Sequence, residues 1–212
     1  MTHPLRGKAA CLAASATLAL LGPGRAAAAL PAAIAEPLQA CVGCHGEDGN
    51  GAKRTYPSLN WQVPKYLEDQ MRGFQDGTQP TNVPKHVPKT FTREQIREIA
   101  KFYGLQKPER EKPAFDAAKA AAGKPLFEAR CAECHLDNGR GSNQEEPTLA
   151  GQPAEYLLNQ EKWYASGKRK YSMKADVAHK GMSDADREAV SHFLASQDIK
   201  PAETAGKKRR RQ

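Results

Sequence analysis

Two pentapeptides in the chain combine residues that can hold a metal-containing cofactor. Residues 41–45 and 131–135 are both C-x-x-C-H motifs, the attachment signature of c-type haem. The two cysteines can form thioethers to the two vinyl groups of one porphyrin, and the histidine is then held under the iron as its proximal ligand. The sequence therefore predicts two covalent haem c groups. The attaching residues are Cys41, Cys44, Cys131 and Cys134, and the iron ligands are His45 and His135.

Other uses of a C-x-x-C pair fit these motifs less well. Such a pair can be redox-active or can hold zinc. A four-cysteine zinc site requires neither histidine, and its pairs usually lie closer together than the 90 residues that separate Cys41 from Cys131. Because haem uses four of the five cysteines and Cys11 lies in the predicted leader, we expect neither a disulfide nor a free thiol in the mature protein.

The N-terminus has the three parts of a secretory signal peptide. Arg6 and Lys8 form a basic region, residues 9–21 form an apolar region, and the alanines at 26–29 offer cleavage sites. We therefore predict a signal peptide over 1–29 and a periplasmic location. The apolar run is shorter than the roughly 20 residues that cross a bilayer, so no transmembrane segment is expected in the mature chain.

The net charge of +8 comes from the two ends of the chain. The leader carries three basic residues and no acidic ones, and the tail carries five basic residues at 207–211. The body is therefore near neutral, and no nucleic-acid partner is expected in the periplasm. The tail is either solvated or docks on an acidic redox partner or an anionic membrane.

The chain matches itself at an offset of 90 residues, which indicates a tandem duplication. We predict one haem domain over 30–106, called here the first half, and another over 114–199, called the second half. A charged linker with prolines (107–113) separates them, and a basic tail follows (200–212). The matched pairs include Gly49 with Gly139, Gly51 with Gly141, Pro57 with Pro147, Leu59 with Leu149, Tyr66 with Tyr156, Leu67 with Leu157 and Gln70 with Gln160.

Helix signals occur in both halves, and no strand pattern is evident. Thr92 and Gln95 form a capping box, and Ser183 can cap the equivalent helix. Residues 117–130 are expected to form a helix that leads into the second motif, with interruptions at Gly123 and Pro125. The predicted class is all-α. Because aromatic residues are only 7% of the chain, each half has a thin core without its porphyrin, and the apo-protein should be largely disordered.

Residues 32–197 resemble the dihaem cytochromes c of the cytochrome c4 type. The resemblance is carried by two C-x-x-C-H motifs, each followed by Pro-x-Leu, Tyr-Leu-x-x-Gln and a terminal amphipathic helix. It implies two tandem class I cytochrome c domains and an electron-carrying role. It also implies that the carbonyl groups of Pro57 and Pro147 accept hydrogen bonds from the proximal histidines and orient their rings. The alternative role of both prolines is turn formation.

The two irons are expected to differ in their sixth ligand. The resemblance implies a methionine between the middle and last helices, and in the second half this is Met173; Met182 is expected to be a packing residue. The first half has no methionine there, but its loop 81–89, called here the ligand loop, contains His86. We assign His86 to the first iron. The alternatives are an open site with water or Asn82, and ligation by Lys85, Lys89 or Met71.

This asymmetry suggests a direction for electron flow. His/His ligation leaves iron at a lower potential than His/Met, so electrons would enter at the first haem and leave from the second. The leading hypothesis is a periplasmic carrier, not an enzyme, that moves single electrons between a respiratory donor and a terminal oxidase or reductase. The alternative is a dihaem subunit of a redox enzyme, or the enzyme itself, which uses an atypically ligated first haem for a reaction such as sulfur-compound oxidation.

Overall fold

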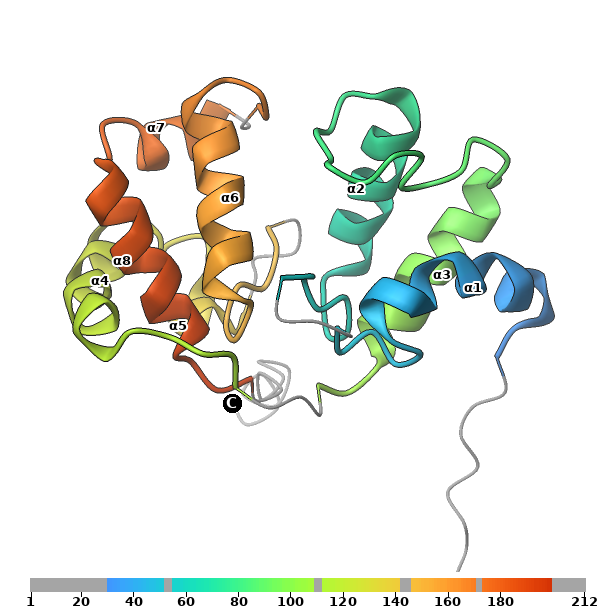
Figure 1. The fold of residues 1–212 in the computed structure, drawn as a ribbon, viewed down its shortest axis with the longest axis horizontal. Coiled ribbons are helices and arrows are strands. Elements are labelled where there is room, and N and C mark those ends of the chain that lie inside the picture. Colours follow the sequence, from blue (N-terminus) through green and yellow to red (C-terminus); the bar gives the residue numbers. More distant parts are fainter. Residues whose placement is uncertain (1–29, 52–54, 109–111, 142–145, 171–172, 200–212) are drawn as a thin grey trace, which may run out of the picture. The chain divides into compact units, whose positions relative to one another are not determined.

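The computed structural model describes residues 30–51, 55–108, 112–141, 146–170 and 173–199. Within these ranges the regular elements are all helices, so the predicted all-α class is confirmed (Figure 1). Both halves belong to one compact unit, Pro31–Gln212. The predicted signal peptide and basic tail lie outside the described residues. Among the described helices, none combines the length and apolar character needed to cross a membrane.

Three helices form the first half: α1 (Ala32–His45), α2 (Pro64–Asp76) and α3 (Arg93–Leu105). The predicted capping box begins α3, because the Gln95 amide donates to Thr92 Oγ1 and the Thr92 amide donates to Gln95 Oε1. Helix α2 begins with Pro64 in its first turn and ends at Gly77 in the left-handed conformation, φ 82°. Helix α3 packs against both α1 and α2.

The second half contains α4 (Ala117–Arg130), α5 (Leu136–Gly139), α6 (Ala154–Ala165), α7 (Met173–His179) and α8 (Asp184–Ala195). Helix α8 packs against α4 and α6 (Figure 1). It begins with a capping box between Ser183 and Asp186. The single turn α5 contains two left-handed residues, so it is a bend after the motif rather than a regular helix.

The predicted interruptions of α4 at Gly123 and Pro125 are wrong, because the helix runs through both residues. At Gly123 the backbone of α8 comes so close that a Cβ would lie 2.1 Å from the carbonyl oxygen of Ala189. The glycine is therefore required by helix packing, and its weak helix propensity is overcome by tertiary contacts.

Matched positions of the two halves make matched backbone hydrogen bonds. The Leu59 amide donates to the Gly49 carbonyl at 2.8 Å, and the Leu149 amide donates to the Gly139 carbonyl at 2.7 Å. Both glycines have positive φ, and a Cβ there would collide with the last helix of the same half, at Tyr103 or Leu194. The loop after each haem motif is thus built the same way and needs glycine at the same place.

Each half has a small apolar core beside its motif. In the second half, Phe127 of α4 contacts Phe193 of α8 with ring centroids 5.1 Å apart. The first-half core is Ile34, Leu38, Leu67, Ile96, Ile99 and Tyr103. The second-half core is Phe127, Cys131, Leu157, Val190, Phe193 and Leu194. Because Cys131 is itself a core residue, the haem attachment point belongs to the interior of the fold.

Candidate functional site

Both proximal histidines are held by the same hydrogen bond. His45 Nδ1 donates to the Pro57 carbonyl, and His135 Nδ1 donates to the Pro147 carbonyl, each at 2.9 Å. The bonds implied by the resemblance are therefore present in both halves. A carbonyl can only accept, so Nδ1 carries the proton and Nε2 keeps its lone pair. Each ring is thereby set in the tautomer and orientation that a metal ligand needs.

Burial keeps these groups neutral. It lowers the pKa of His45 to about 4 and also lowers the pKa of His135. Burial raises the pKa of the Cys41 thiol to about 11 and that of Cys131 to about 12. Reactive C-x-x-C dithiols need a lowered thiol pKa. These cysteines have the opposite environment, which fits covalent thioether attachment better than thiol–disulfide exchange.

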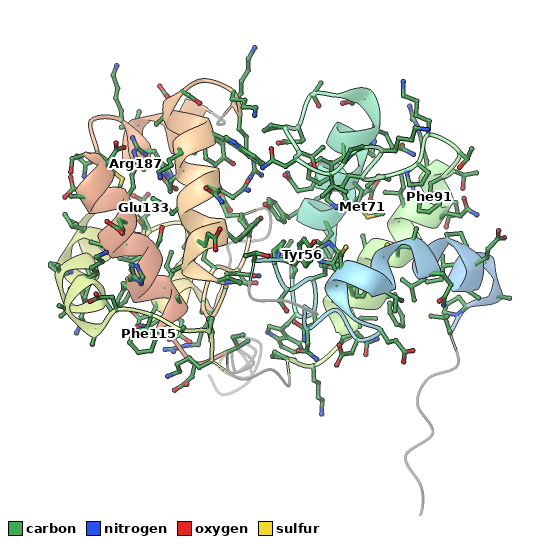
Figure 2. The ribbon with its side chains drawn as sticks, in the orientation of Figure 1. Tyr56, Met71, Phe91, Phe115, Glu133 and Arg187 are labelled. Atoms are coloured by element: carbon green, nitrogen blue, oxygen red, sulfur yellow. The ribbon has the colours of Figure 1, made fainter. Side chains whose placement is uncertain are left out.

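A cavity of about 670 Å³ lies beside Cys41, Cys44 and His45. This volume falls within the roughly 300–1,000 Å³ of typical cofactor sites. The ring of Tyr56, labelled in Figure 2, has its centroid 6.2 Å from that of His45. The apolar or aromatic side chains of the lining include Leu59, Leu67, Met71, Phe74, Ile99 and Tyr103.

The ligand loop faces His45 from another side of the same cavity. His86 lines the cavity, and its ring is nearly parallel to that of His45, with centroids 6.1 Å apart and planes 18° apart. Burial lowers the pKa of His86. Of the alternative ligands, Asn82 and Lys85 are exposed residues at the cavity, and Lys89 is exposed.

The second half holds the segment between α6 and α8 with buried charges. Arg187 of α8, labelled in Figure 2, donates to the Glu161 carboxylate at 2.9 Å. His179, at the end of α7, lies 3.0 Å from the same carboxylate. Met182 packs against the apolar core, as predicted. Met173 is the first residue of α7, but its side chain lies outside the described residues, so its ligand role stays a prediction.

Two buried glutamines join the halves by exchanging equivalent contacts. Gln62 binds the backbone of Thr148, donating at 2.9 Å and accepting at 2.8 Å. Gln152 binds the backbone of Ser58, donating and accepting at 2.9 Å. Ser58 and Thr148 directly follow the two prolines that bind the proximal histidines. The glutamines therefore connect the two proximal sides. Sequence reasoning missed them, although Gln62 and Gln152 match at the 90-residue offset.

Arg169 supplies a buried positive charge between the halves. It is 5% exposed, its guanidinium lies 4.7 Å from the Tyr164 ring centroid, and Nη2 donates to Tyr66 Oη at 3.2 Å. It also binds Gln70 and Gln160. Its Nε has no hydrogen-bond partner within the described part of the chain, and the residue lines the cavity.

The cavity residues fit a haem. A propionate is an anionic acceptor of the kind that a buried guanidinium N–H requires, and Arg169 Nε offers such a donor. The apolar lining suits the porphyrin, the cysteines suit its vinyl groups, and His45 suits its iron.

Comparisons with known proteins show what the whole chain is similar to. The cytochrome c family model matches residues 120–198. A thiosulfate dehydrogenase electron acceptor from Thiomonas intermedia is 31% identical over 196 residues, which cover 86% of this chain and 90% of that protein. The crystal structure of reduced cytochrome c4 from Pseudomonas stutzeri has a TM-score of 0.66 at 26% identity, covering 77% of this chain and 96% of that chain.

A second solved structure is a thiosulfate dehydrogenase from Marichromatium purpuratum. It has a TM-score of 0.66 at 28% identity, and the match covers 75% of this chain but 36% of that chain. The similarity is thus confined to part of the larger protein.

Proposed function

The chain belongs to the dihaem cytochromes c of the cytochrome c4 type, and from this we propose that it is a periplasmic carrier that takes single electrons from a sulfur-compound dehydrogenase and delivers them to a terminal oxidase or reductase. Membership of this family already means that the protein is an electron-transfer cytochrome with two covalent haem c groups. Each bound haem supplies a one-electron centre. The polypeptide contributes ligation, burial and contact surfaces.

One observation carries this proposal: both halves prepare an iron-binding imidazole in the same way. His45 and His135 have identical 2.9 Å bonds to their proline carbonyls. Gln62 and Gln152 then connect the residues that follow those prolines. Two redox centres held by one hydrogen-bonded framework suit a protein that passes an electron from one centre to the other with little structural change.

The names of the relatives support the choice of donor. The Thiomonas protein is described as an electron acceptor of thiosulfate dehydrogenase, and the Marichromatium structure is a thiosulfate dehydrogenase with a region similar to this chain. We propose a donor of the same kind here, a dehydrogenase that oxidises thiosulfate or a related sulfur compound.

The test is anaerobic reduction of the oxidised holoprotein by a purified thiosulfate dehydrogenase with thiosulfate. We expect two electrons per chain to appear in the haem absorption bands, and no reduction when either the dehydrogenase or thiosulfate is omitted. Failure of reduction would contradict the donor. Reduction by thiosulfate without the dehydrogenase would favour the alternative, in which this protein is itself a redox enzyme.

We also propose export and a duplicated origin. The leader pattern at 1–29 and the covalent attachment motifs support a periplasmic location. The matched hydrogen bonds around Gly49 and Gly139 support one haem domain copied into 30–106 and 114–199. The mass of the mature protein tests the first point: it should correspond to a chain without the leader plus two haems. A mature chain that retains residues 1–29 would contradict export with cleavage.

A further inference from the structure

We infer that His86 is the second axial ligand of the first haem, so that this iron is held between two histidines. This inference rests on the proposed function and deepens it, because it sets the order in which the two haems take up electrons. It is carried by the geometry of the ligand loop around His45.

The distance between the two imidazoles is that of ligands on opposite sides of one iron. The bond from an imidazole nitrogen to a metal ion is about 2.0–2.1 Å long, as known for zinc. The nitrogen itself lies roughly 1.1 Å from the centre of its ring. Two rings that bind one metal ion from opposite sides therefore have centroids about 6.3 Å apart. The centroids of His45 and His86 are 6.1 Å apart. The spacing of the two rings therefore matches that of two imidazoles that bind one metal ion between them.

The same nitrogen is available on both rings. His45 Nδ1 is bound to the Pro57 carbonyl, and His86 Nδ1 lies 3.3 Å from the Thr81 hydroxyl. These contacts leave Nε2 of each ring for the metal. A ligating histidine is usually fixed in this way by a hydrogen bond at its other nitrogen. Thr81 would therefore orient the His86 ring as Pro57 orients that of His45, and Nε2 is free to bind the metal when Nδ1 donates to the hydroxyl.

The ligand loop is held in place by contacts with the rest of the first half. The Phe74 ring of α2 packs on His86, with centroids 4.5 Å apart. Gln75 Nε2 donates to the carbonyls of Pro88 and Phe91 at 2.7 and 3.0 Å. Val87 is buried. His86 is thus held by the Phe74 ring, by Thr81 before it and by the anchored segment after it.

The other candidate ligands lack this support. Asn82, Lys85 and Lys89 are exposed, and a lysine must lose its proton before it can bind iron. Met71 lines the cavity from the middle of α2. His86 is the candidate whose ring is aligned with that of His45.

Two histidine ligands set the first iron at a lower potential than a histidine–methionine pair, because a thioether favours ferrous iron. With Met173 on the second iron, an electron would prefer the second haem by about 50-fold, which corresponds to about 100 mV at 59 mV per decade. The electron then enters at the Cys41/Cys44 haem and leaves from the Cys131/Cys134 haem.

The test is low-temperature paramagnetic resonance of the oxidised, full-length holoprotein. Near-parallel imidazole planes, as in the 18° arrangement, should give a rhombic low-spin spectrum with three resolved g values. In the His86→Ala variant this signal should disappear, and one of the two ferrous haems should bind carbon monoxide. In His86→Met a second methionine-type signal should replace it, and the 50-fold preference should fall towards one.

Two control variants test the rival ligands in the same spectra. Lys89→Ala and Met71→Leu should keep the bis-imidazole signal. The inference is overturned if that signal is absent from the wild type, or if it survives in both His86 variants. If the His86 assignment fails in this way but the donor still reduces both haems, the proposed carrier function remains valid. If the wild-type chain takes up no haem, the proposed function itself fails.

Discussion

The two halves of the molecule agree around His45 and His135 and differ in the segment that precedes the last helix of each half. In the second half, α7 and a buried contact between Arg187 and Glu161 hold the segment before α8. In the first half, residues 78–92 form turns, and neutral contacts from Gln75 hold them. Met71 stands at the position that matches Glu161, so the first half cannot form the charged contact.

This difference shows which part of a haem site is free to vary. In the proposed haem sites, the attachment cysteines, the proximal histidine and its proline carbonyl must keep one geometry, because they would fix the cofactor. The segment on the other side only has to present a ligand. A change there would alter the potential of the iron and leave the attachment intact, so the two halves can be different redox centres.

The largest effect is expected from removing the attachment points of one half at a time. Cys41→Ala with Cys44→Ala, and Cys131→Ala with Cys134→Ala, should each remove one of the two haems completely, because the thioethers cannot form. Intact-protein mass and haem absorbance measure the haem content. Either double variant with two covalent haems would contradict the assignment.

A smaller effect is expected from Met173→His. The preference of one electron for the second haem over the first, about 50-fold in the wild type, should be lost. This variant gives the second iron the ligands inferred for the first, and the difference of about 100 mV should vanish. Spectroelectrochemical titration measures both potentials. Met182→Leu is the control, because Met182 packs against the core and should leave the potentials unchanged. An unchanged second potential in Met173→His would exclude Met173 as the ligand.

The ion pair between Arg187 and Glu161 in the second half should contribute more to stability than the more exposed ion pairs of Glu68 in the first half. Glu161→Gln leaves the buried Arg187 without its carboxylate, which should lower the free energy of unfolding by about 2 kcal/mol. Glu68→Gln is the matched change in the first half, where both arginine partners are about half exposed; the expected loss is below about 1 kcal/mol. Denaturant titration of the holoproteins measures both. Equal losses would mean that the two halves are not held differently.

The smallest effect on stability is expected from removing the Gln62 and Gln152 side chains, and it should be similar for the two. Gln62→Ala leaves the half-buried backbone N–H and C=O of Thr148 without these hydrogen bonds, and Gln152→Ala does the same for the buried groups of Ser58. The expected loss of stability is about 1–2 kcal/mol for each variant. Gln106→Ala, whose side chain donates within its own helix region to Phe102, is the control and should change stability by less than about 0.5 kcal/mol. Clearly unequal losses for the two glutamines would show that the exchange of contacts is not equivalent.

Much of the fold could be predicted because its signals are local. The capping box at Thr92 and the cap at Ser183 mark the starts of α3 and α8, and the helix predicted over 117–130 has the bounds of α4. Helix α7 was not predicted, because its seven residues are too short for a helical period to be recognised.

The contacts between the halves could not be predicted from local pattern. Arg169 lies between two lysines and resembles a solvated residue in the sequence, but Tyr66 and Gln70, about a hundred positions earlier, bury it. Gln62 and Gln152 bind backbone groups, which leave no side-chain signature. The sequence indicated these contacts only through the presence of glutamine at both matched positions, 62 and 152.

The exchanged glutamine contacts have a consequence for the origin of the chain. Gln62 binds the residue that matches Ser58, and Gln152 binds Ser58 itself, so the surface is self-complementary in the way of an isologous dimer interface. Under the proposed duplication, two separate copies of the ancestral domain could meet through these contacts as a homodimer. In a homodimer every substitution occurs in both subunits, whereas gene fusion allows a residue such as His86 to be confined to one.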